Sequence, residues 1–194
     1  VSIDLNLRRA CMLDMRSHSM QQIGFKTLIG ADGANSCIRR IAAGRRPKVR
    51  ASIQTEVPVF NQEMILDFQH EGRGYSWYIP HKETAMIGFM SWSCDTQLAR
   101  ARLVEELSRY ETKYQLLNQT FLTSFIPTGN DVLLEYDGVY FVGDAAGLAT
   151  PKTGAGIRLA LESAVKLYLA LSENKSYESL LGRELAYLET ESYF

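Results

Sequence analysis

The fold of this chain is decided by the stretch Val139-Tyr140-Phe141-Val142-Gly143-Asp144-Ala145-Ala146-Gly147. Its first four residues form an apolar run without polar alternation, which is typical of a strand buried on both faces of a parallel sheet. Ligands of such sheets bind beyond the carboxyl ends of the strands, and Gly143-Asp144 stands at that position. The stretch therefore predicts a buried strand that delivers a carboxylate to a ligand site.

The residues after this strand have the properties of a ligand-binding turn. Small side chains at Ala145, Ala146 and Gly147 allow a ligand to approach the backbone closely. The Asp144 carboxylate can accept hydrogen bonds from ribose or ribityl hydroxyls, and a helix that starts near residues 154–156 offers unpaired N–H groups and the positive end of its dipole. An ordinary turn built on Gly and Asp is the alternative, and the Gly-Asp pair alone does not separate the two.

A second strand end carries a similar pair of residues. The apolar run 27–30 leads into Asp32-Gly33, and a short helix is predicted from Asn35 to Ala43, stopped by Gly44. The two acidic-glycine turns lie far apart in the sequence, which indicates one sheet interrupted by another domain. The predicted fold class is α/β with α+β character, a partial Rossmann-like domain interrupted by a mainly antiparallel sheet.

The rest of the chain shows the alternation of strands and the periodicity of helices. Ile53, Thr55 and Val57 alternate with polar residues, and Met64, Leu66 and Phe68 do so in the next strand, which predicts a sheet with one covered face. Extended segments are predicted at 1–16, 21–30, 50–57, 63–69, 75–80, 84–92 and 119–126, and helices at 96–116, 155–172 and 176–190.

Charge and hydropathy exclude several classes of partner. The chain has 194 residues and a formal net charge of −1, so no global field attracts nucleic acid or an anionic membrane. No apolar run reaches the roughly 20 residues of a transmembrane helix, so membrane contact is expected to be peripheral at most. The basic run from Arg39 to Arg50 is interpreted as a solvated face, with contact to a phosphate group as the alternative.

The cysteines and histidines follow no ligand pattern. Cys11, Cys37 and Cys94 are odd in number and widely spaced, which favours a reduced and cytoplasmic chain. The three histidines have no metal-ligand spacing and no nucleophile partner, so no metal site is predicted.

Two longer motifs resemble those of a known class of flavoproteins. Gly143 to Ile157, through its GDAAG, Pro151 and TGxGI elements, resembles the second FAD-binding motif of the p-hydroxybenzoate hydroxylase-like oxidoreductases. Ala31 to Arg39 is similar to their other signature, a DG turn followed by Ser and Arg. Both motifs lie in the order of that family.

Within this class, three features resemble the geranylgeranyl reductases, which saturate isoprenoid double bonds. Gly147 stands where many hydroxylases carry His, the run Thr153 to Ile157 resembles the TGEGI of the reductases, and Gly72 to Pro80 resembles their GYxWxxP segment. Ala155 departs from the pattern, because the reductases usually carry Glu there, and a local role of that carboxylate is lost.

The resemblance implies roles for particular residues. Asp144 is expected to bind the ribityl or phosphate region of FAD, and Pro151 with the 154–156 backbone to lie against the isoalloxazine ring. Tyr75 and Trp77 are expected to line an apolar substrate pocket, with core filling as the alternative. No catalytic residue is assigned, and Asp32 and Arg39 are expected to support the cofactor or the approach of a nicotinamide donor. The full set of expected cofactor-binding residues is Asp32, Gly33, Arg39, Gly143, Asp144, Pro151, Gly154, Ala155, Gly156 and Ile157.

The resemblance also implies a division of the chain and a missing part. Residues 1–48 and 128–194 are expected to form the partial FAD-binding domain, and residues 49–127 the substrate domain. The GxGxxG unit that opens this family is not found here, and the chain begins inside an alternating segment, so we interpret it as N-terminally truncated. Strand 139–142 is then expected to expose an apolar edge where the missing segment would pack.

The function implied is that of an FAD-dependent oxidoreductase that reduces isoprenoid C=C bonds. An apolar or lipid substrate is expected, with NAD(P)H or another reductant as electron donor. Two alternatives remain open at this point: an FAD-dependent aromatic monooxygenase, and an inactive fragment that holds no cofactor.

Overall fold

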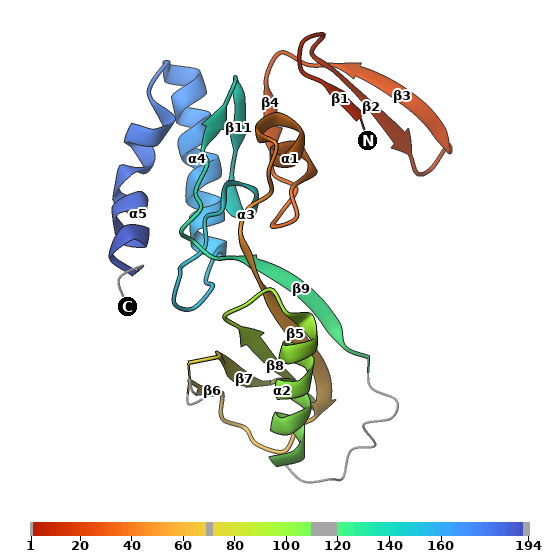
Figure 1. Cartoon of the computed structure of the whole chain (residues 1–194), viewed down its shortest axis with the longest axis vertical. Helices are drawn as coiled ribbons and strands as arrows, with labels where there is room; N and C mark the ends of the chain where they lie inside the picture. The colour runs from red at the N-terminus through yellow and green to blue at the C-terminus, as the bar shows by residue number, and fades with distance from the viewer. Residues whose placement is uncertain (1, 69–71, 110–119, 192–194) are drawn as a thin grey trace. The chain divides into compact units, whose positions relative to one another are not determined.

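The polypeptide divides into two units in a computed structural model that describes residues 2–68, 72–109 and 120–191 (Figure 1). Unit 1 comprises Val1–Lys48 and Pro127–Phe194, and unit 2 comprises Val49–Ile126. The cofactor and substrate roles expected of the two parts stay predictions at the level of the fold.

The central sheet of unit 1 contains both strand ends. Its order is β10-β11-β4, and β11 (Val139–Phe141) runs parallel to β4 (Leu28–Gly30), with Phe141 opposite Gly30. The prediction of one sheet interrupted by another domain is thereby confirmed. The prediction of an exposed edge on strand 139–142 is wrong, because β10 (Glu135–Tyr136), which no sequence pattern indicated, pairs antiparallel with its other side. Within the described residues, β10 and β4 are the two edge strands of this sheet.

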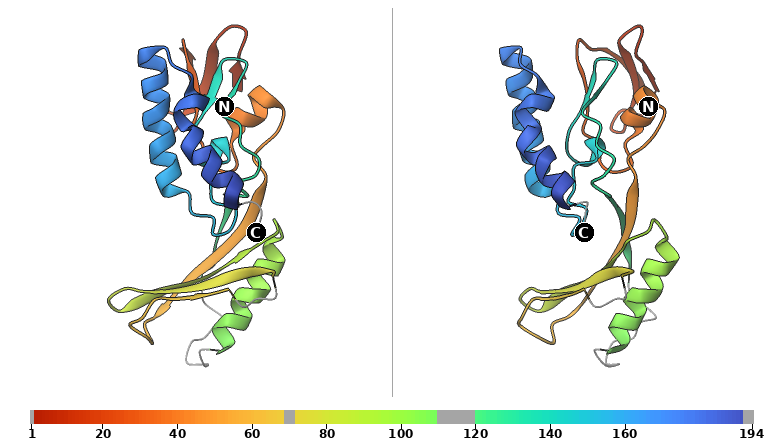
Figure 2. Two further views of the ribbon diagram at one scale, coloured as in Figure 1. Left: turned by 90° about the vertical axis from the view of Figure 1, so that its left-hand side faces the viewer. Right: turned by 60° about the vertical axis from the view of Figure 1, so that its left-hand side comes forward.

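The described part of unit 1 contains four helices. Leu159, Ser163, Leu167 and Ala170 are buried along one face of α4, as the 3.6-residue period requires, and α4 packs side by side with α5 (Figure 2). On the other side of α4, Ile157 is 84% exposed, Leu161 66% and Tyr168 70%. α4 is therefore apolar on two sides, of which one is covered in the described structure. The bounds are α1 Cys37–Ala43, α3 Gly143–Ala146, α4 Ile157–Glu173 and α5 Tyr177–Glu191.

The first residues of unit 1 form a separate antiparallel sheet. The predicted extended segment 1–16 is broken by a turn in which Asp4 accepts a hydrogen bond from the Leu7 N–H, and a second turn follows in which Asp14 accepts one from the Arg16 N–H. Asp side chains favour such turns, and the alternation on both sides hid them. The strands are β1 Ser2–Asp4, β2 Arg9–Asp14 and β3 Ser19–Gly24, in the order β1-β2-β3.

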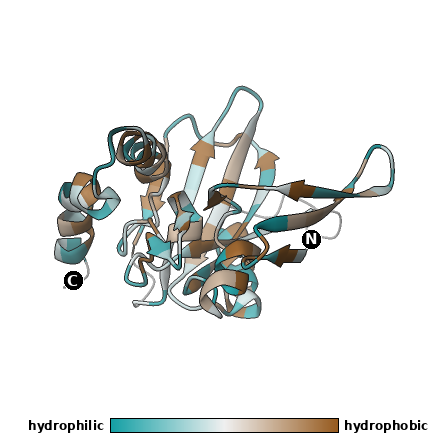
Figure 3. Cartoon of the chain, turned by 90° about the horizontal axis from the view of Figure 1, so that it is seen from above, coloured by the Kyte–Doolittle hydropathy of each residue, from teal (hydrophilic) through white to brown (hydrophobic). Residues whose placement is uncertain are grey.

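The described part of unit 2 is a five-stranded antiparallel sheet with one helix on one face. α2 (Thr96–Arg109) packs on β5 and β8, and the predicted helical residues 110–116 lie outside the described residues. Ile53, Thr55 and Val57 are buried on the covered face, as predicted, and the strands show alternating bands of hydropathy (Figure 3). The strand order is β6-β7-β8-β5-β9, with β5 Val49–Pro58, β6 Ile65–Asp67, β7 Gly74–Pro80, β8 Thr84–Ser91 and β9 Leu122–Pro127.

The sequence pattern of residues 63–69 predicted the wrong face of the strand as the buried one. Met64, Leu66 and Phe68 are exposed, whereas Ile65, between them, packs against the core that α2 covers. Neighbouring residues of a strand point to opposite faces, so an error of one residue exchanges the predicted buried face and the predicted exposed face. The consequence is an apolar outer face on β6, at the edge of the sheet.

Candidate cofactor site

The turn after β11 is fixed to helix α4. The Gly143 N–H donates a hydrogen bond of 3.0 Å to Ser163 Oγ, and a Cβ at Gly143 would lie 3.1 Å from the Ala160 Cβ. Hydrogen bonds from Gly147 N–H to the Asp144 carbonyl and from Leu148 N–H to the Gly143 carbonyl close the turn as the short helix α3. The fully buried Ser163, which sequence reasoning did not single out, thus anchors the turn; its only signal was a polar residue on the apolar face of a helix.

Asp144 presents its carboxylate to the N-terminus of α4. A Cβ at Gly156 would lie 3.1 Å from Asp144 Oδ1, and α4 begins at Ile157 without a side-chain cap. Burial raises the pKa of Asp144. Across the described ranges, no hydrogen bond or ion pair engages this carboxylate. A half-buried acceptor beside uncapped N–H groups suits a ligand that brings hydroxyl donors together with a negative charge.

The loop between this turn and α4 is closed by its own hydrogen bonds. Thr150 Oγ1 accepts from the Ala155 N–H at 2.9 Å, and the Thr150 carbonyl accepts from the Gly154 N–H at 2.9 Å. Pro151 is buried, and a Cβ at Gly129 would lie 2.9 Å from its Cδ. The loop therefore has a defined shape, and its contact with a flavin ring stays a prediction.

Asp32 organises the helix that follows it. Its Oδ1 accepts from Ser36 Oγ at 2.5 Å, and its Oδ2 accepts from the N–H groups of Cys37 at 2.6 Å and Ile38 at 3.1 Å. Gly33 contributes its carbonyl, which accepts from the Ser36 N–H. Because both oxygens of Asp32 cap α1, any support it gives to a cofactor is through the position of that helix.

Arg39 lies inside unit 1 with none of its side chain exposed. Nη2 forms an ion pair of 3.0 Å with Asp131 Oδ2 and donates to the Asp131 carbonyl at 3.1 Å, while Nη1 donates to the Ala145 carbonyl at 3.4 Å. Burial lowers the pKa of Arg39, and the charge of Asp131 opposes that shift. Arg39 therefore connects the turn after β4 with the turn after β11 through a buried side chain, and any effect on a cofactor would be indirect.

Asp131 is the second residue of this site that sequence reasoning missed. Burial acts to raise its pKa, but the hydrogen bond from Arg45, the charge of Arg39 and the Lys48 N–H outweigh burial and lower it. Its only sequence signal was an ordinary Gly-Asn-Asp turn. The basic run is consequently split: Arg40, Arg45, Arg46 and Lys48 are exposed, as predicted for a solvated face, whereas Arg39 is buried against Asp131 and Arg50 is half-buried in unit 2.

The small residues of the turn serve packing within the chain. Ala145 and Ala146 have no exposed surface, and a Cβ at Gly147 would lie 2.5 Å from the Asp131 carbonyl oxygen. The expectation that these small side chains make room for a ligand is therefore wrong for Gly147, because the Asp131 backbone fills the space that a side chain at this position would occupy. Two cavities of unit 1 also lie away from Asp32 and Asp144, one of about 420 Å³ between β4 and α4 and one of about 910 Å³ beside β10.

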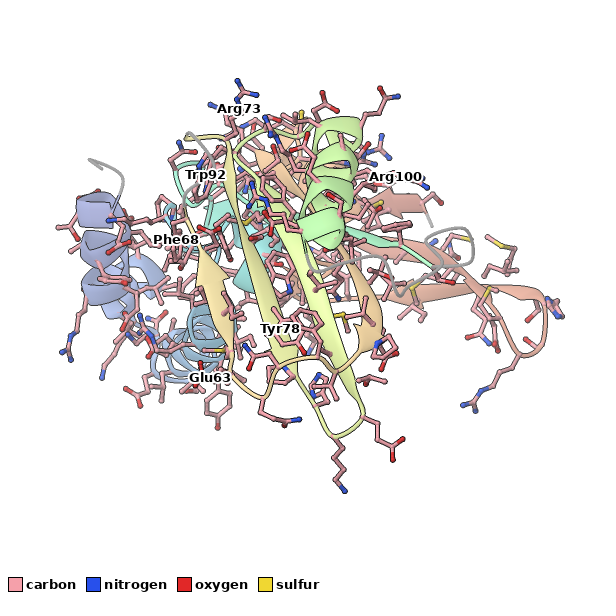
Figure 4. All side chains as sticks on the ribbon, turned by 90° about the horizontal axis from the view of Figure 1, so that it is seen from below. Glu63, Phe68, Arg73, Tyr78, Trp92 and Arg100 are labelled. Atoms are coloured by element: carbon pink, nitrogen blue, oxygen red, sulfur yellow. The ribbon has the colours of Figure 1, made fainter. Side chains whose placement is uncertain are left out.

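Tyr75 and Trp77 lie together on the open face of the unit 2 sheet. The Trp77 ring covers Gly88, where a Cβ would lie 2.1 Å from Trp77 Cζ2, and Tyr75 lies 5.8 Å from Trp77 and 5.0 Å from Phe68 between ring centroids. The Trp92 ring, labelled with Phe68 in Figure 4, also lies near Tyr75, at 6.0 Å between ring centroids. Tyr75 and Trp77 are half-buried and are not among the residues of the core that α2 covers, and their role in a substrate pocket stays a prediction.

The solved structures with a similar fold are flavoprotein structures and a related reductase-like protein. A geranylgeranyl bacteriochlorophyll reductase-like protein of Thermoplasma acidophilum matches with a TM-score of 0.68, 21% identity, 91% of this chain and 53% of its own. The flavin-dependent halogenase CmlS matches with a TM-score of 0.61, 17% identity, 100% of this chain and 39% of its own. The chain thus has the fold of the FAD-dependent oxidoreductases, which confirms the predicted fold class.

Sequence comparison identifies the group of FAD-dependent oxidoreductases that this chain resembles. The chain is 31% identical to geranylgeranyl diphosphate reductase of Rhodobacter capsulatus over 147 residues, which are 68% of this chain and 36% of the relative. It is 31% identical to digeranylgeranylglycerophospholipid reductase of Methanocaldococcus jannaschii over 151 residues, 71% of this chain and 38% of the relative. No family model matches the chain. The chain is therefore a relative of the geranylgeranyl reductases, as its motifs predicted, and it spans well under half of their length.

The described residues contain neither a membrane-spanning helix nor a metal-binding group of side chains. No helix among them has the length and hydropathy needed to cross a membrane. No group of three or more His, Cys, Asp or Glu side chains is placed to hold a metal ion, and the predicted absence of a metal site stays a prediction.

Proposed function

We propose that this chain forms part of an FAD-dependent reductase that saturates C=C bonds of an isoprenoid lipid. The observation that carries the proposal is the half-buried Asp144 carboxylate at the end of β11, beside the uncapped N-terminus of α4, in a relative of two prenyl-lipid reductases. A carboxylate and free N–H groups at a strand end are the donors and acceptors that a flavin ribityl chain and ring require. The residues present therefore fit the cofactor.

Each residue has a distinct role in this proposal. Asp144 would accept hydrogen bonds from ribityl hydroxyls, and the 154–156 backbone with Pro151 would lie against the ring. Bound FAD, reduced by NAD(P)H or another reductant, would supply a hydride to one carbon of the alkene while a proton reaches the other carbon. Tyr75 and Trp77 would hold the apolar chain of the substrate on their sheet face, where aromatic rings bind apolar groups without polar competition.

Part of the proposed enzyme lies outside these 194 residues. Ile29 on the unpaired edge of β4 and the exposed α4 residues Leu161 and Tyr168 leave an apolar surface in unit 1. Exposed apolar surfaces of this kind are normally covered in a complete protein. We propose that a further segment of the intact enzyme covers this surface and completes the flavin site, with the protein in the cytoplasm and in at most peripheral contact with a membrane.

A flavin titration tests the cofactor part of the proposal. We expect FAD fluorescence to be quenched on binding, and Asp144→Ala to weaken binding by at least tenfold, because a charge-assisted hydrogen bond contributes about 1.5–3 kcal/mol. Asp137→Ala, which removes an exposed acid of the β10–β11 hairpin, is the matched control and should leave the affinity unchanged. A parent chain that takes up no FAD would favour the inactive-fragment alternative for these 194 residues.

A product assay tests the reaction. The intact protein, loaded with FAD and given NAD(P)H and geranylgeranyl diphosphate, should yield a product heavier by two hydrogens for each reduced bond, as seen by mass spectrometry. Oxygen consumption with hydroxylation of an aromatic compound, and no change in the prenyl compound, would favour the monooxygenase alternative instead.

A further inference from the structure

One acidic side chain supports both strand-end turns of unit 1. The Asp131 carboxylate accepts hydrogen bonds from Arg39 Nη2 at 3.0 Å, from the Lys48 N–H at 3.1 Å and from the Arg45 guanidinium. Only 9% of this side chain is exposed, against 53% for Arg45. A carboxylate with three donors in a mostly buried place has one favoured position, since any displacement breaks charge-assisted hydrogen bonds.

The backbone of the same segment runs along the second turn. The Leu133 N–H donates to the Ala146 carbonyl at 2.9 Å, and the Asp131 carbonyl oxygen lies 2.5 Å from the position that a Cβ of Gly147 would take. Arg39, held by Asp131, reaches the Ala145 carbonyl of that turn. The Asp131 backbone therefore packs directly on the turn, and the Arg39 guanidinium adds a hydrogen bond to the turn.

The first turn reaches Asp131 through helix α1. Asp32 and Ser36 cap the N-terminus of α1, and the Arg39 N–H donates to Ser36 Oγ at 2.9 Å. Arg39 thus belongs by its backbone to the first turn and by its guanidinium to the second. Asp131 is the partner that fixes the guanidinium.

We propose that Asp131 is a positioning residue of the candidate cofactor site, which holds the Asp32 turn and the Asp144 turn in one mutual placement through Arg39. The role is exerted through Arg39 and Gly147. It rests on the proposed function only where it concerns FAD. Loss of the partners that orient a binding group typically weakens binding about 10- to 100-fold, and we expect the same range for FAD when Asp131 is replaced.

The first test needs no flavin. Amide hydrogen exchange in Asp131→Asn should increase at Gly147 and Leu148, whose N–H groups close the turn. The matched control is Leu181→Ala, which creates a cavity at a buried position of α5 and lowers the stability of unit 1 by a change outside the sequence of either turn. Increased exchange at the turn that is no larger than in Leu181→Ala, at equal loss of melting temperature, would overturn the positioning role.

A second variant and an FAD titration complete the test of the positioning role. If Asp131→Asn does not fold, Asp131→Glu, which keeps the charge on a longer side chain, enters the same comparison and should loosen the turn to a smaller degree. An FAD titration of the variants is then compared with that of the parent chain. Weaker FAD binding together with a looser turn supports both proposals, whereas a looser turn in a chain that never binds FAD supports the positioning role and favours the inactive-fragment alternative for these 194 residues.

Discussion

The substitution Gly147→Ala gives the sharpest test of how the second turn is held. Gly147 adopts φ 87°, a left-handed conformation that costs a residue with a Cβ about 1–2 kcal/mol. The new Cβ would also lie 2.5 Å from the Asp131 carbonyl oxygen, which is backbone and cannot rotate away. Overpacking of this kind costs about 1–3 kcal/mol, so we expect unit 1 to lose about 2–5 kcal/mol of unfolding free energy.

Gly138→Ala is the control that separates the two costs. Gly138 adopts φ 75°, but a Cβ there would meet no atom within 4 Å. The control should therefore lose only the conformational cost of about 1–2 kcal/mol. The difference between the variants measures the contact between Gly147 and Asp131.

The assay must report on unit 1 alone. Both tryptophans, Trp77 and Trp92, belong to unit 2, so tryptophan fluorescence serves as the internal reference. Native-state amide exchange of peptides covering β11 and α4 gives the unfolding free energy of unit 1. Equal losses in Gly147→Ala and Gly138→Ala would refute the conclusion that Asp131 packs against the turn.

Three further outcomes are expected. Because burial raises the folded-state pKa of Asp144 above its ordinary value of 3.8, the folded state binds the proton more tightly; the free energy of unfolding should therefore fall as pH rises from 3.8 through the raised pKa. Asp144→Asn should lack this fall, and its free energy of unfolding should exceed that of the parent chain by about 1 kcal/mol at pH 7. Denaturation at several pH values measures both curves, and a parent chain that gains stability relative to Asp144→Asn as pH rises would contradict the raised pKa of Asp144. Gly88→Ala should displace the Trp77 indole, cost about 1–3 kcal/mol and shift the tryptophan emission to longer wavelength, whereas an unchanged spectrum would show that the ring does not lie on Gly88. Arg39→Met should cost about 3–5 kcal/mol and Arg45→Gln less than about 1 kcal/mol in urea denaturation, because only the first leaves Asp131 without its buried partner; similar losses would contradict the buried bridge.

Local sequence patterns predicted the elements on which the site is built. The apolar run 139–142 followed by Gly-Asp predicted a buried strand with a carboxylate at its end, and the run from Asn35 to Gly44 predicted the short helix that follows Asp32. Such signals are local, because a strand's burial and a helix's cap depend on residues within a few positions. The fold class and the relation to the geranylgeranyl reductases followed from these motifs and were confirmed.

Patterns of period two failed where the face of a strand had to be chosen. Met64, Leu66 and Phe68 alternate as well as Ile53, Thr55 and Val57 do, yet the first set is exposed and the second is buried. Alternation says that a strand has two faces, and the neighbour that covers one of them is a tertiary contact. The same limit explains β10, whose two residues form a strand only because β11 lies beside them.

The sequence by itself determined which residues end the two parallel strands, because those residues are set by local runs and turn chemistry. The tertiary structure decided what these residues do. Arg39 is buried against Asp131 and Gly147 packs on the Asp131 carbonyl, whereas the Asp144 carboxylate has no hydrogen-bond partner among the described residues. The physical reason is that hydrogen-bond partners and buried charges are chosen across long sequence separations, where no local pattern records them.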